Sequence, residues 1–416
     1  MKRLILLTFL FNAIIANSQN NKVIDWGADL DFIKVELPKN HFNFYTQKSE
    51  KDFFNGLEGI AFEKDKLSDF GISVKLQQLV ASFGDSHTEV RFQSLIDVNK
   101  ILPLGLFWFS DGIFVIQTTA ENKTILGYKI LGVNGIPIKV VIDSLSTLLT
   151  IDNNAIIKNS FPQIMPCVQF LECFGITKST NIELQLENPK GESYNYIIKP
   201  AVMNRSNMVK VTPNSSPMCY QNTRAYFIDY NLKKDNVYYI QYNTCYSRET
   251  PPPSFRGRIE NLPSFDEFYK KVIDTINGNN FGKIIFDMRF NGGGSSPQGT
   301  KLISELSTMK NVNQKGKLYV ILGRKTFSSA IINAMDFKNL TQAIFVGEET
   351  GGKPNHFGEV KFFDLPSSGI KVQYSTKYFG QNSKAMNTIT PDYIIEPSFK
   401  DYQEGHDPVY EWILKH

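Results

Sequence analysis

Two short segments combine glycines or serines with the end of an apolar run, and both could support acyl-transfer chemistry. The first, FDMRFNGGGSSPQG, brings Gly292, Gly293 and Gly294 just after a predicted buried strand, 283–289. Backbone amides in such a turn, next to a helix N-terminus, can bind an anion or stabilise a developing oxyanion. A phosphate loop is one alternative, but the Lys-Ser/Thr ending of that motif is missing. A tight structural turn would explain three glycines equally well.

The second segment, GRKTFSSAIINAMDF, opens a predicted helix with Ser328 and Ser329 directly after the predicted strand 317–324. A serine at this point lies above the edge of a sheet, near the positive end of a helix dipole, where it could act as a nucleophile. Serine is also a favoured N-cap residue, so helix capping is the alternative role. The chain has no Gly-x-Ser-x-Gly elbow, which argues against the hydrolase fold that uses it.

Both segments belong to a region in which predicted strands and helices alternate. Apolar strand-like runs alternate with helix-like runs that carry capping signals, such as Ser264 followed by Glu267 and Pro297 at a helix start. The expected strands are 237–243, 283–289, 317–324 and 342–349, and the expected helices are 264–279, 297–309 and 328–340. This alternation predicts a layered α/β domain over residues 230–416.

The preceding residues divide into two further regions. Apolar residues recur at three- and four-residue spacing in 52–62 and 73–84, which predicts a largely helical region over 19–100. From Leu102 the chain is rich in β-branched and aromatic residues, interrupted by Asp-Gly and Asn-Gly turn pairs. We expect a β-rich module over 101–200, followed by a polar connection.

The N-terminus has the pattern of a secretory signal peptide. Lys2 and Arg3 precede an apolar run of about a dozen residues, and small residues follow up to Ser18. The run is shorter than the roughly 20 apolar residues that cross a membrane. We therefore expect residues 1–18 to be removed, leaving a secreted or periplasmic chain with no membrane span.

The composition of the chain argues against some classes of function. The 416 residues carry 45 Lys and Arg against 41 Asp and Glu, a net charge of +4 that is too small to indicate nucleic-acid binding. The cysteines and histidines lack zinc-site spacing, and we expect no metal or organic cofactor. Export would permit disulfides, whose pairing the sequence leaves open. The four cysteines are Cys167, Cys173, Cys219 and Cys245.

Several motifs, in order, resemble the serine peptidase family that contains the C-terminal processing (tail-specific) proteases, tricorn protease and interphotoreceptor retinoid-binding protein. The motifs are FGDSHTEVRF (83–92), KIIFDMRFNGGG (283–294), RKTFSSAIINAMDF (324–337), FVGEETGGKPNHFGEV (345–360) and ITPDYII (389–395). ILGVNGIPI (130–138) is similar to part of a PDZ-like domain. The resemblance implies an α/β multi-domain protein with a ClpP/crotonase-like layered catalytic domain, an N-terminal helical region and a PDZ-like module.

The resemblance also implies roles for individual residues. Ser328 becomes the nucleophile in preference to Ser329, and the amides of Ser329 and of either Gly292 or Gly293 form the oxyanion hole. The family pattern often has a glutamate where this chain has Ile331.

The general base is open between two residues. Processing proteases use a lysine, which corresponds to Lys353, whereas the tricorn-like branch uses a histidine, which corresponds to His87 in the Ser86-His87 pair. His87 is preferred because its ordinary pKa suits a base near neutral pH, and the Ser86 hydroxyl could orient the imidazole. His356 is expected to be a loop residue.

These features predict a secreted serine peptidase that acts on a peptide or protein substrate through an acyl-enzyme, with the PDZ-like module able to hold a peptide by strand addition. One alternative is a catalytically inactive peptide- or ligand-binding protein on the same scaffold, which the exchange at Ile331 favours. An acyl esterase would use the same nucleophile.

Overall fold

The computed structural model describes residues 23–381 and 384–416. The predicted signal peptide therefore lies outside the described residues. None of the described helices is long and apolar enough to cross a membrane. The helices are α1 (Trp26–Asn40), α2 (Glu50–Glu63), α3 (Asp69–Ala81), α4 (Ile138–Ser146), α5 (Asn154–Ile164), α6 (Val168–Cys173), α7 (Met218–Gln221), α8 (Phe265–Asn277), α9 (Ser296–Thr308), α10 (Ser329–Leu340), α11 (Phe399–Glu404) and α12 (Pro408–Lys415).

The strands form three sheets. They are β1 (Glu89–Arg91), β2 (Leu104–Phe109), β3 (Gly112–Thr119), β4 (Lys129–Val133), β5 (Ile136–Pro137), β6 (Ile182–Glu187), β7 (Ser193–Ile198), β8 (Met208–Lys210), β9 (Phe227–Leu232), β10 (Val237–Tyr242), β11 (Lys283–Asp287), β12 (Leu318–Leu322), β13 (Ile344–Gly347), β14 (His356–Asp364), β15 (Lys371–Phe379) and β16 (Tyr393–Ile394).

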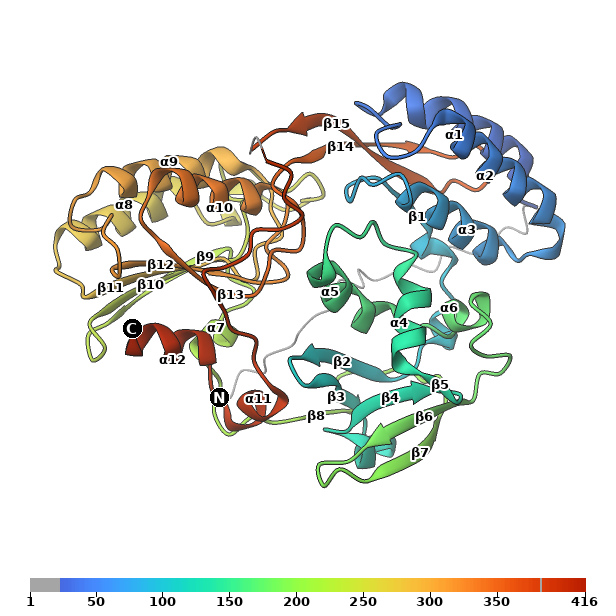
Figure 1. Cartoon of the computed structure of the whole chain (residues 1–416), viewed down its shortest axis with the longest axis horizontal. Coiled ribbons are helices and arrows are strands. Elements are labelled where there is room, and N and C mark those ends of the chain that lie inside the picture. Colours follow the sequence, from blue (N-terminus) through green and yellow to red (C-terminus); the bar gives the residue numbers. More distant parts are fainter. Residues whose placement is uncertain (1–22, 382–383) are drawn as a thin grey trace.

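The predicted α/β domain contains a six-stranded sheet in the order β16-β13-β12-β11-β10-β9. Strands β10 to β13 and β16 are parallel, and only the edge strand β9 runs antiparallel. Helices α8, α9 and α10 lie on one face and α12 on the other (Figure 1). The carboxyl ends of β11 and β12, which lead into the glycine and serine segments, are therefore adjacent.

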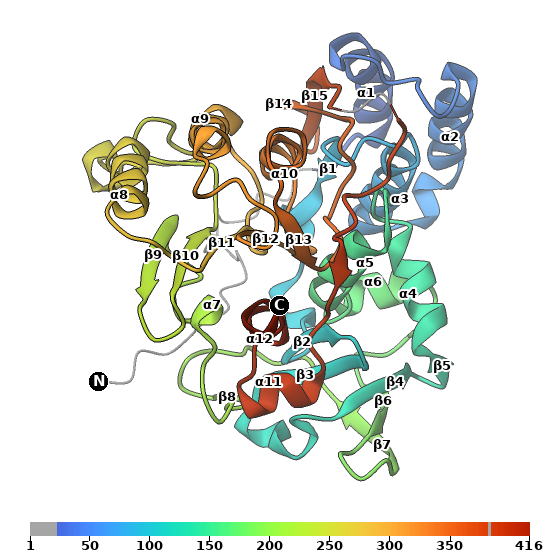
Figure 2. The same cartoon turned by 60° about the vertical axis from the view of Figure 1, so that its left-hand side comes forward.

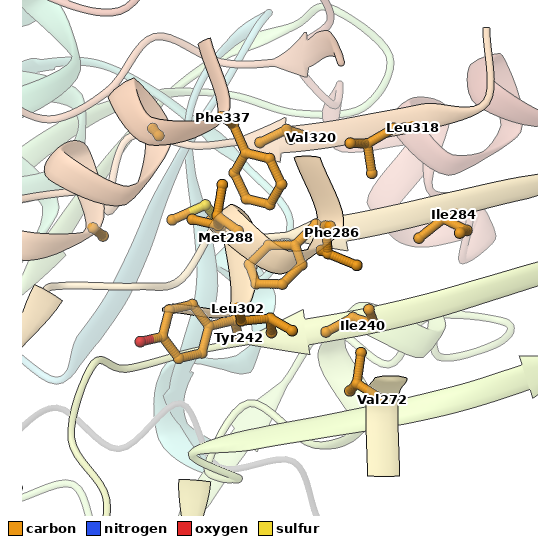
Figure 3. Packing of buried hydrophobic residues seen from close by; sticks show 14 of the residues in the cluster. Ile240, Tyr242, Val272, Ile284, Phe286, Met288, Leu302, Leu318, Val320 and Phe337 are labelled. Carbon is orange, nitrogen blue, oxygen red and sulfur yellow. The ribbon is translucent and has the colours of Figure 1, made fainter. Parts of the chain in front are cut away.

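Alternating side chains along the strands give this sheet two buried faces. Ile240, Phe286 and Val320 pack with Leu302 and Phe337 from the helices on one face (Figure 3). On the other face, strand residues pack against Val409 and Ile413 of α12. Because both faces are covered, the strands read as continuous apolar runs in the sequence.

The β-rich module contains a sheet in the order β2-β3-β4-β6-β7, which β5 and β8 extend. Helices α4, α5 and α6 interrupt the strands between β5 and β6. Residues 138–146, within the β-branched stretch of this module, form the helix α4, in which Val141 and Leu145 lie one helical turn apart and are both buried. Helical periodicity outweighed the β-branched composition there.

The N-terminal helices pack against strands from the far end of the chain. β1 pairs with β15, which pairs with β14, in a three-stranded antiparallel sheet. Val372 and Tyr374 of β15 share a buried cluster with residues of α1, α2 and α3. Figure 2 also shows β14 and β15 beside α1. This arrangement brings the residues after α3 to the edge of the α/β domain.

Candidate active site

The glycine segment after β11 is held by the buried side chain of Asn291. Its Nδ2 donates to the carbonyl of Tyr242 at 3.0 Å, and its Oδ1 accepts from the amide of Gly293 at 2.9 Å. Gly293 has φ 101°, a conformation that favours glycine. Since the Gly293 amide already donates to Asn291, it is not free to bind an oxyanion. Of the two glycines expected for an oxyanion hole, only Gly292 keeps an amide with no partner among the described residues.

Ser328 precedes α10 in a conformation that is rare for a residue with a side chain. Its φ is 53° and its ψ is −126°, and its side chain makes no capping hydrogen bond. The alternative role of Ser328 as an ordinary N-cap is therefore not seen. Ser329 Oγ, in contrast, donates to the carbonyl of Gly294 at 2.8 Å. Within the described residues, the Ser328 hydroxyl has no hydrogen-bond partner.

The glycine segment and the serine lie in direct contact. A Cβ added at Gly293 would lie 2.8 Å from the Cβ of Ser328 and 3.1 Å from the amide nitrogen of Ser329. The Phe327 amide also donates to the Asn291 carbonyl at 3.0 Å. The Ser329 amide, at the start of α10, has no acceptor among the described residues. The serine hydroxyl and two unpaired amides therefore share one small region.

His87 lies in the turn after α3 and is buried beside this region. Its ring stacks on the ring of Phe327 at a centroid distance of 4.6 Å and on that of His356 at 5.5 Å. Neither ring nitrogen has a hydrogen-bond partner among the described residues. Burial lowers the pKa of His87 to about 4, against the opposing charge of Asp85. The imidazole is therefore neutral at physiological pH.

Asp85 is the carboxylate closest to this imidazole, with Oδ1 4.0 Å from His87 Nδ1. It accepts hydrogen bonds from the His87 amide at 2.9 Å and from Ser375 Oγ at 2.6 Å, and it pairs with His41 Nε2 at 2.9 Å. Burial would raise the pKa of Asp85, but His41, His87 and the hydroxyl donors hold it well below its usual range. A fixed negative charge therefore faces one side of the imidazole.

Asp85 was not among the predicted site residues, and Ser86 was expected to orient the imidazole instead. The Ser86 hydroxyl makes no hydrogen bond to His87 and is buried without a partner that meets hydrogen-bond geometry. The signal that could have identified Asp85 is the spacing Asp-x-His, since an aspartate often accepts from the amide two residues on.

Lys353 is engaged in an ion pair. Its Nζ lies 2.8 Å from Asp152 Oδ1 of the β-rich module and donates to the carbonyl of Gly84 at 3.3 Å. An ammonium held by a carboxylate has no lone pair with which to accept a proton. His356, which was expected in a loop, is instead the buried first residue of β14. Its Nδ1 pairs with the carbonyl of Pro354 at 3.0 Å, and burial lowers its pKa.

A cleft of about 790 Å³ is lined by neighbours of both residues, with Thr88 next to His87 and Phe327 next to Ser328. Residues from the N-terminal region, the β-rich module and the catalytic domain line it, among them Ser86, Gly292, Lys325 and Phe327. The described residues contain no cluster of side chains that could hold a metal ion. All four cysteines are free thiols, so the structure forms none of the disulfides that export would permit.

Comparisons with known proteins agree with this architecture. The model of peptidase family S41 matches residues 305–395, a segment that includes Ser328 but neither His87 nor the glycine segment. No curated protein sequence matches the chain.

Among solved structures, mature CPAF complexed with lactacystin matches with a TM-score of 0.63 at 14% identity, over 93% of this chain and 96% of that chain. A second structure, of mature CPAF, matches with a TM-score of 0.62 at 13% identity, over 92% of this chain and 94% of that chain. At such identities these matches show a shared fold. The layered α/β fold expected from the motifs is confirmed, and the family match over residues 305–395 supports the expected serine peptidase family.

Proposed function

We propose that this chain, a peptidase of family S41 by its sequence match and its fold, hydrolyses peptide bonds through an acyl-enzyme on Ser328. The observation that carries the proposal is the state of Ser328 itself. A φ of 53° at a non-glycine residue costs roughly 1–3 kcal/mol and persists where the surroundings impose it. Here the strained backbone frees a hydroxyl beside the unpaired amides of Gly292 and Ser329.

In the proposed reaction, Ser328 Oγ attacks the carbonyl carbon of the peptide while His87 accepts the hydroxyl proton. The carbonyl oxygen becomes an oxyanion that the Gly292 and Ser329 amides stabilise. The C–N bond then breaks as His87 returns the proton to the leaving amine, and water hydrolyses the acyl-enzyme. Asp85 supplies a negative charge next to the imidazolium that forms between these steps.

His87 and Ser328 are not hydrogen-bonded to each other in this structure. Catalytic hydrogen bonds are often long in unliganded enzymes and shorten when substrate binds. Support for His87 therefore comes from its contact with Phe327, its buried neutral imidazole and the nearby Asp85. The ion pair of Lys353 with Asp152 supports the same choice.

Covalent labelling by a fluorophosphonate probe tests the nucleophile. The wild-type protein should be labelled, and Ser328→Ala should not. Ser329→Ala keeps its amide and should therefore still be labelled, although at a reduced rate. Mass spectrometry of the labelled peptide identifies the modified serine. Labelling that survives Ser328→Ala but not Ser329→Ala would show that Ser329, and not Ser328, is the nucleophile.

The alternative function is ligand binding without catalysis. It is favoured by Ile331, whose side chain is buried in the core where the family pattern often has a glutamate. A folded wild-type protein that resists the probe, cleaves no peptide and still binds peptides would support this alternative.

Secretion or a periplasmic location forms a separate part of the proposal and depends on residues 1–18. Its support is the basic start, the apolar run and the small residues before the expected cleavage after Ser18. N-terminal sequencing of the protein recovered outside the cytoplasm should begin at Gln19. A cytoplasmic product that retains Met1 would contradict it.

A further inference from the structure

The cleft lined by Phe327 and Gly292, next to Ser328, contains one charged side chain that no described carboxylate neutralises. Its charged lining residues, among those described, are Glu89, Arg324 and Lys325. Glu89 pairs with Arg91 at 2.9 Å. Arg324 pairs with Glu348, with Nη2 2.7 Å from Oε1. Lys325 has neither an ion pair nor a hydrogen-bonded side-chain partner within the described part of the chain.

Lys325 is also largely withdrawn from solvent. Burial lowers its pKa, with the neighbouring charge of Arg324 acting in the same direction, and no carboxylate opposes this effect. An ammonium in such surroundings has lost hydration without gaining a counter-ion. That arrangement costs free energy unless an anion arrives from outside.

The position of Lys325 connects this charge to the reaction. It lies three residues before Ser328, on the segment that leaves β12 and enters α10. Arg324 and Thr326, on either side of it, are fixed by Glu348 and by the Met288 carbonyl, to which Thr326 Oγ1 donates at 2.9 Å. The neighbours of Lys325 are therefore held in place, whereas no described side chain holds its ammonium.

We propose that Lys325 is a specificity-determining residue that binds a carboxylate of the substrate close to the scissile bond. The carboxylate comes from an acidic side chain or from the C-terminus of the peptide. This inference rests on the proposed peptidase function. It predicts a preference for peptides with a carboxylate at this position, because a charge-assisted hydrogen bond in a desolvated site is stronger than a hydrogen bond between neutral groups.

The experiment uses internally quenched peptides in matched sets. In one set, Glu, Gln or Lys occupies each of several positions on either side of the cleaved bond, with an amidated C-terminus. In the other set, neutral peptides end in a free carboxylate or in an amide. The measured quantity is kcat/KM for the wild type and for Lys325→Met, Lys325→Arg and Lys325→Glu. Lys315→Met, which removes an exposed lysine outside the cleft, is the matched control.

The wild type should prefer Glu over Gln at one position, or the free carboxylate over the amide, by about tenfold or more. Lys325→Met should abolish this preference and keep most of the activity on neutral peptides. Lys325→Arg should retain the preference, Lys325→Glu should invert it towards Lys, and Lys315→Met should resemble the wild type. The set that shows the preference identifies the source of the carboxylate.

Two results would overturn the inference while leaving the peptidase proposal intact. One is hydrolysis with no carboxylate preference in either set. The other is an equal loss of turnover on all peptides in Lys325→Met, which would assign the residue to the chemistry instead of to specificity.

Peptide affinity for the Ser328→Ala variant distinguishes failure of the peptidase proposal. If no peptide is cleaved but Glu peptides bind this variant in a Lys325-dependent way, the peptidase proposal fails and the carboxylate site stands. If they bind no better than Gln peptides, and free carboxylates no better than amides, the carboxylate site fails as well.

Discussion

At the scale of single residues, two side chains compete for the role of general base, and their surroundings differ in kind. His87 is buried and neutral, with both ring nitrogens unpaired and Asp85 nearby. Lys353 is charged and paired with Asp152. A base needs a free lone pair, so only the histidine is ready to accept a proton without breaking an existing interaction.

Removal of each candidate base should therefore have very different effects. We expect His87→Ala to lower kcat by about 10³-fold or more, as expected when the base that activates a serine is lost. Lys353→Met should lower it by about tenfold or less. Steady-state turnover of one peptide substrate by both variants is the measurement. An inactive Lys353→Met next to an active His87→Ala would establish a serine–lysine dyad instead.

The pH dependence of turnover should reflect the buried imidazole. The proposed reaction needs neutral His87, and burial lowers its pKa to about 4, so acid should remove the active form only as the pH falls towards that value. We expect kcat/KM to stay nearly constant from pH 7 to about pH 5 and to decline below that. The measurement is a profile over pH 3.5–8, with stability checked at each pH. A midpoint near 6.5 would mean that the imidazole is solvated in the working enzyme.

At the scale of elements, two strand-to-helix connections build the site together. β11 and β12 are neighbours in a parallel sheet, so their carboxyl ends bring the glycine segment against Ser328. Asn291 fixes the glycine segment by bonding both to Gly293 and to the carbonyl of Tyr242. Contact between the segments leaves no space for a side chain at Gly293, whereas Gly292 faces open space.

The two glycines should therefore respond differently to the same substitution. Gly293→Ala would strain a residue with φ 101° and push against Ser328, so we expect turnover to fall by about 10²-fold, comparable to the loss of an oxyanion-hole donor. Gly292→Ala keeps its amide and meets nothing within 4 Å, so turnover should stay within about threefold. The measurement is kcat at saturating peptide, after circular dichroism has established matching folds. Equal effects would show that the amide geometry does not depend on this contact.

At the scale of the whole molecule, the site lies where three parts of the chain meet. Lys353 of the catalytic domain contacts Asp152 of the β-rich module and Gly84 of the turn that carries His87. Lys158 and Glu396 form a second ion pair between module and catalytic domain at 2.6 Å. The position of His87 relative to Ser328 thus depends on how the parts are held together.

Loss of Asp152 should weaken this junction. Asp152→Ala leaves a largely buried ammonium unpaired, and we expect the thermal unfolding midpoint to fall by about 5 °C or more. The double variant Asp152→Asn with Lys353→Met removes both charges and should recover most of that loss. Differential scanning calorimetry measures both. If the double variant is no more stable than Asp152→Ala, the pairing of the charges is not what stabilises the junction.

The sequence by itself determined the layered α/β domain, the two connections and the candidate residues. Buried parallel strands leave continuous apolar runs, and turns that precede helices require glycines and small polar residues, so both features are local and visible in the sequence. The elements from β10 to α10 lie where they were expected.

Only the tertiary structure decided among the candidates. Whether Gly292 or Gly293 has a free amide depends on Asn291, and whether Lys353 can act as a base depends on Asp152, about 200 residues away in the chain. The charge of Asp85 likewise depends on residues distant in the chain, since its hydrogen-bond partners include His41 and Ser375. Burial and the neighbours in space set a residue's protonation state and decide which of its hydrogen-bond donors and acceptors stay unpaired. Spacing along the chain does not encode such long-range contacts.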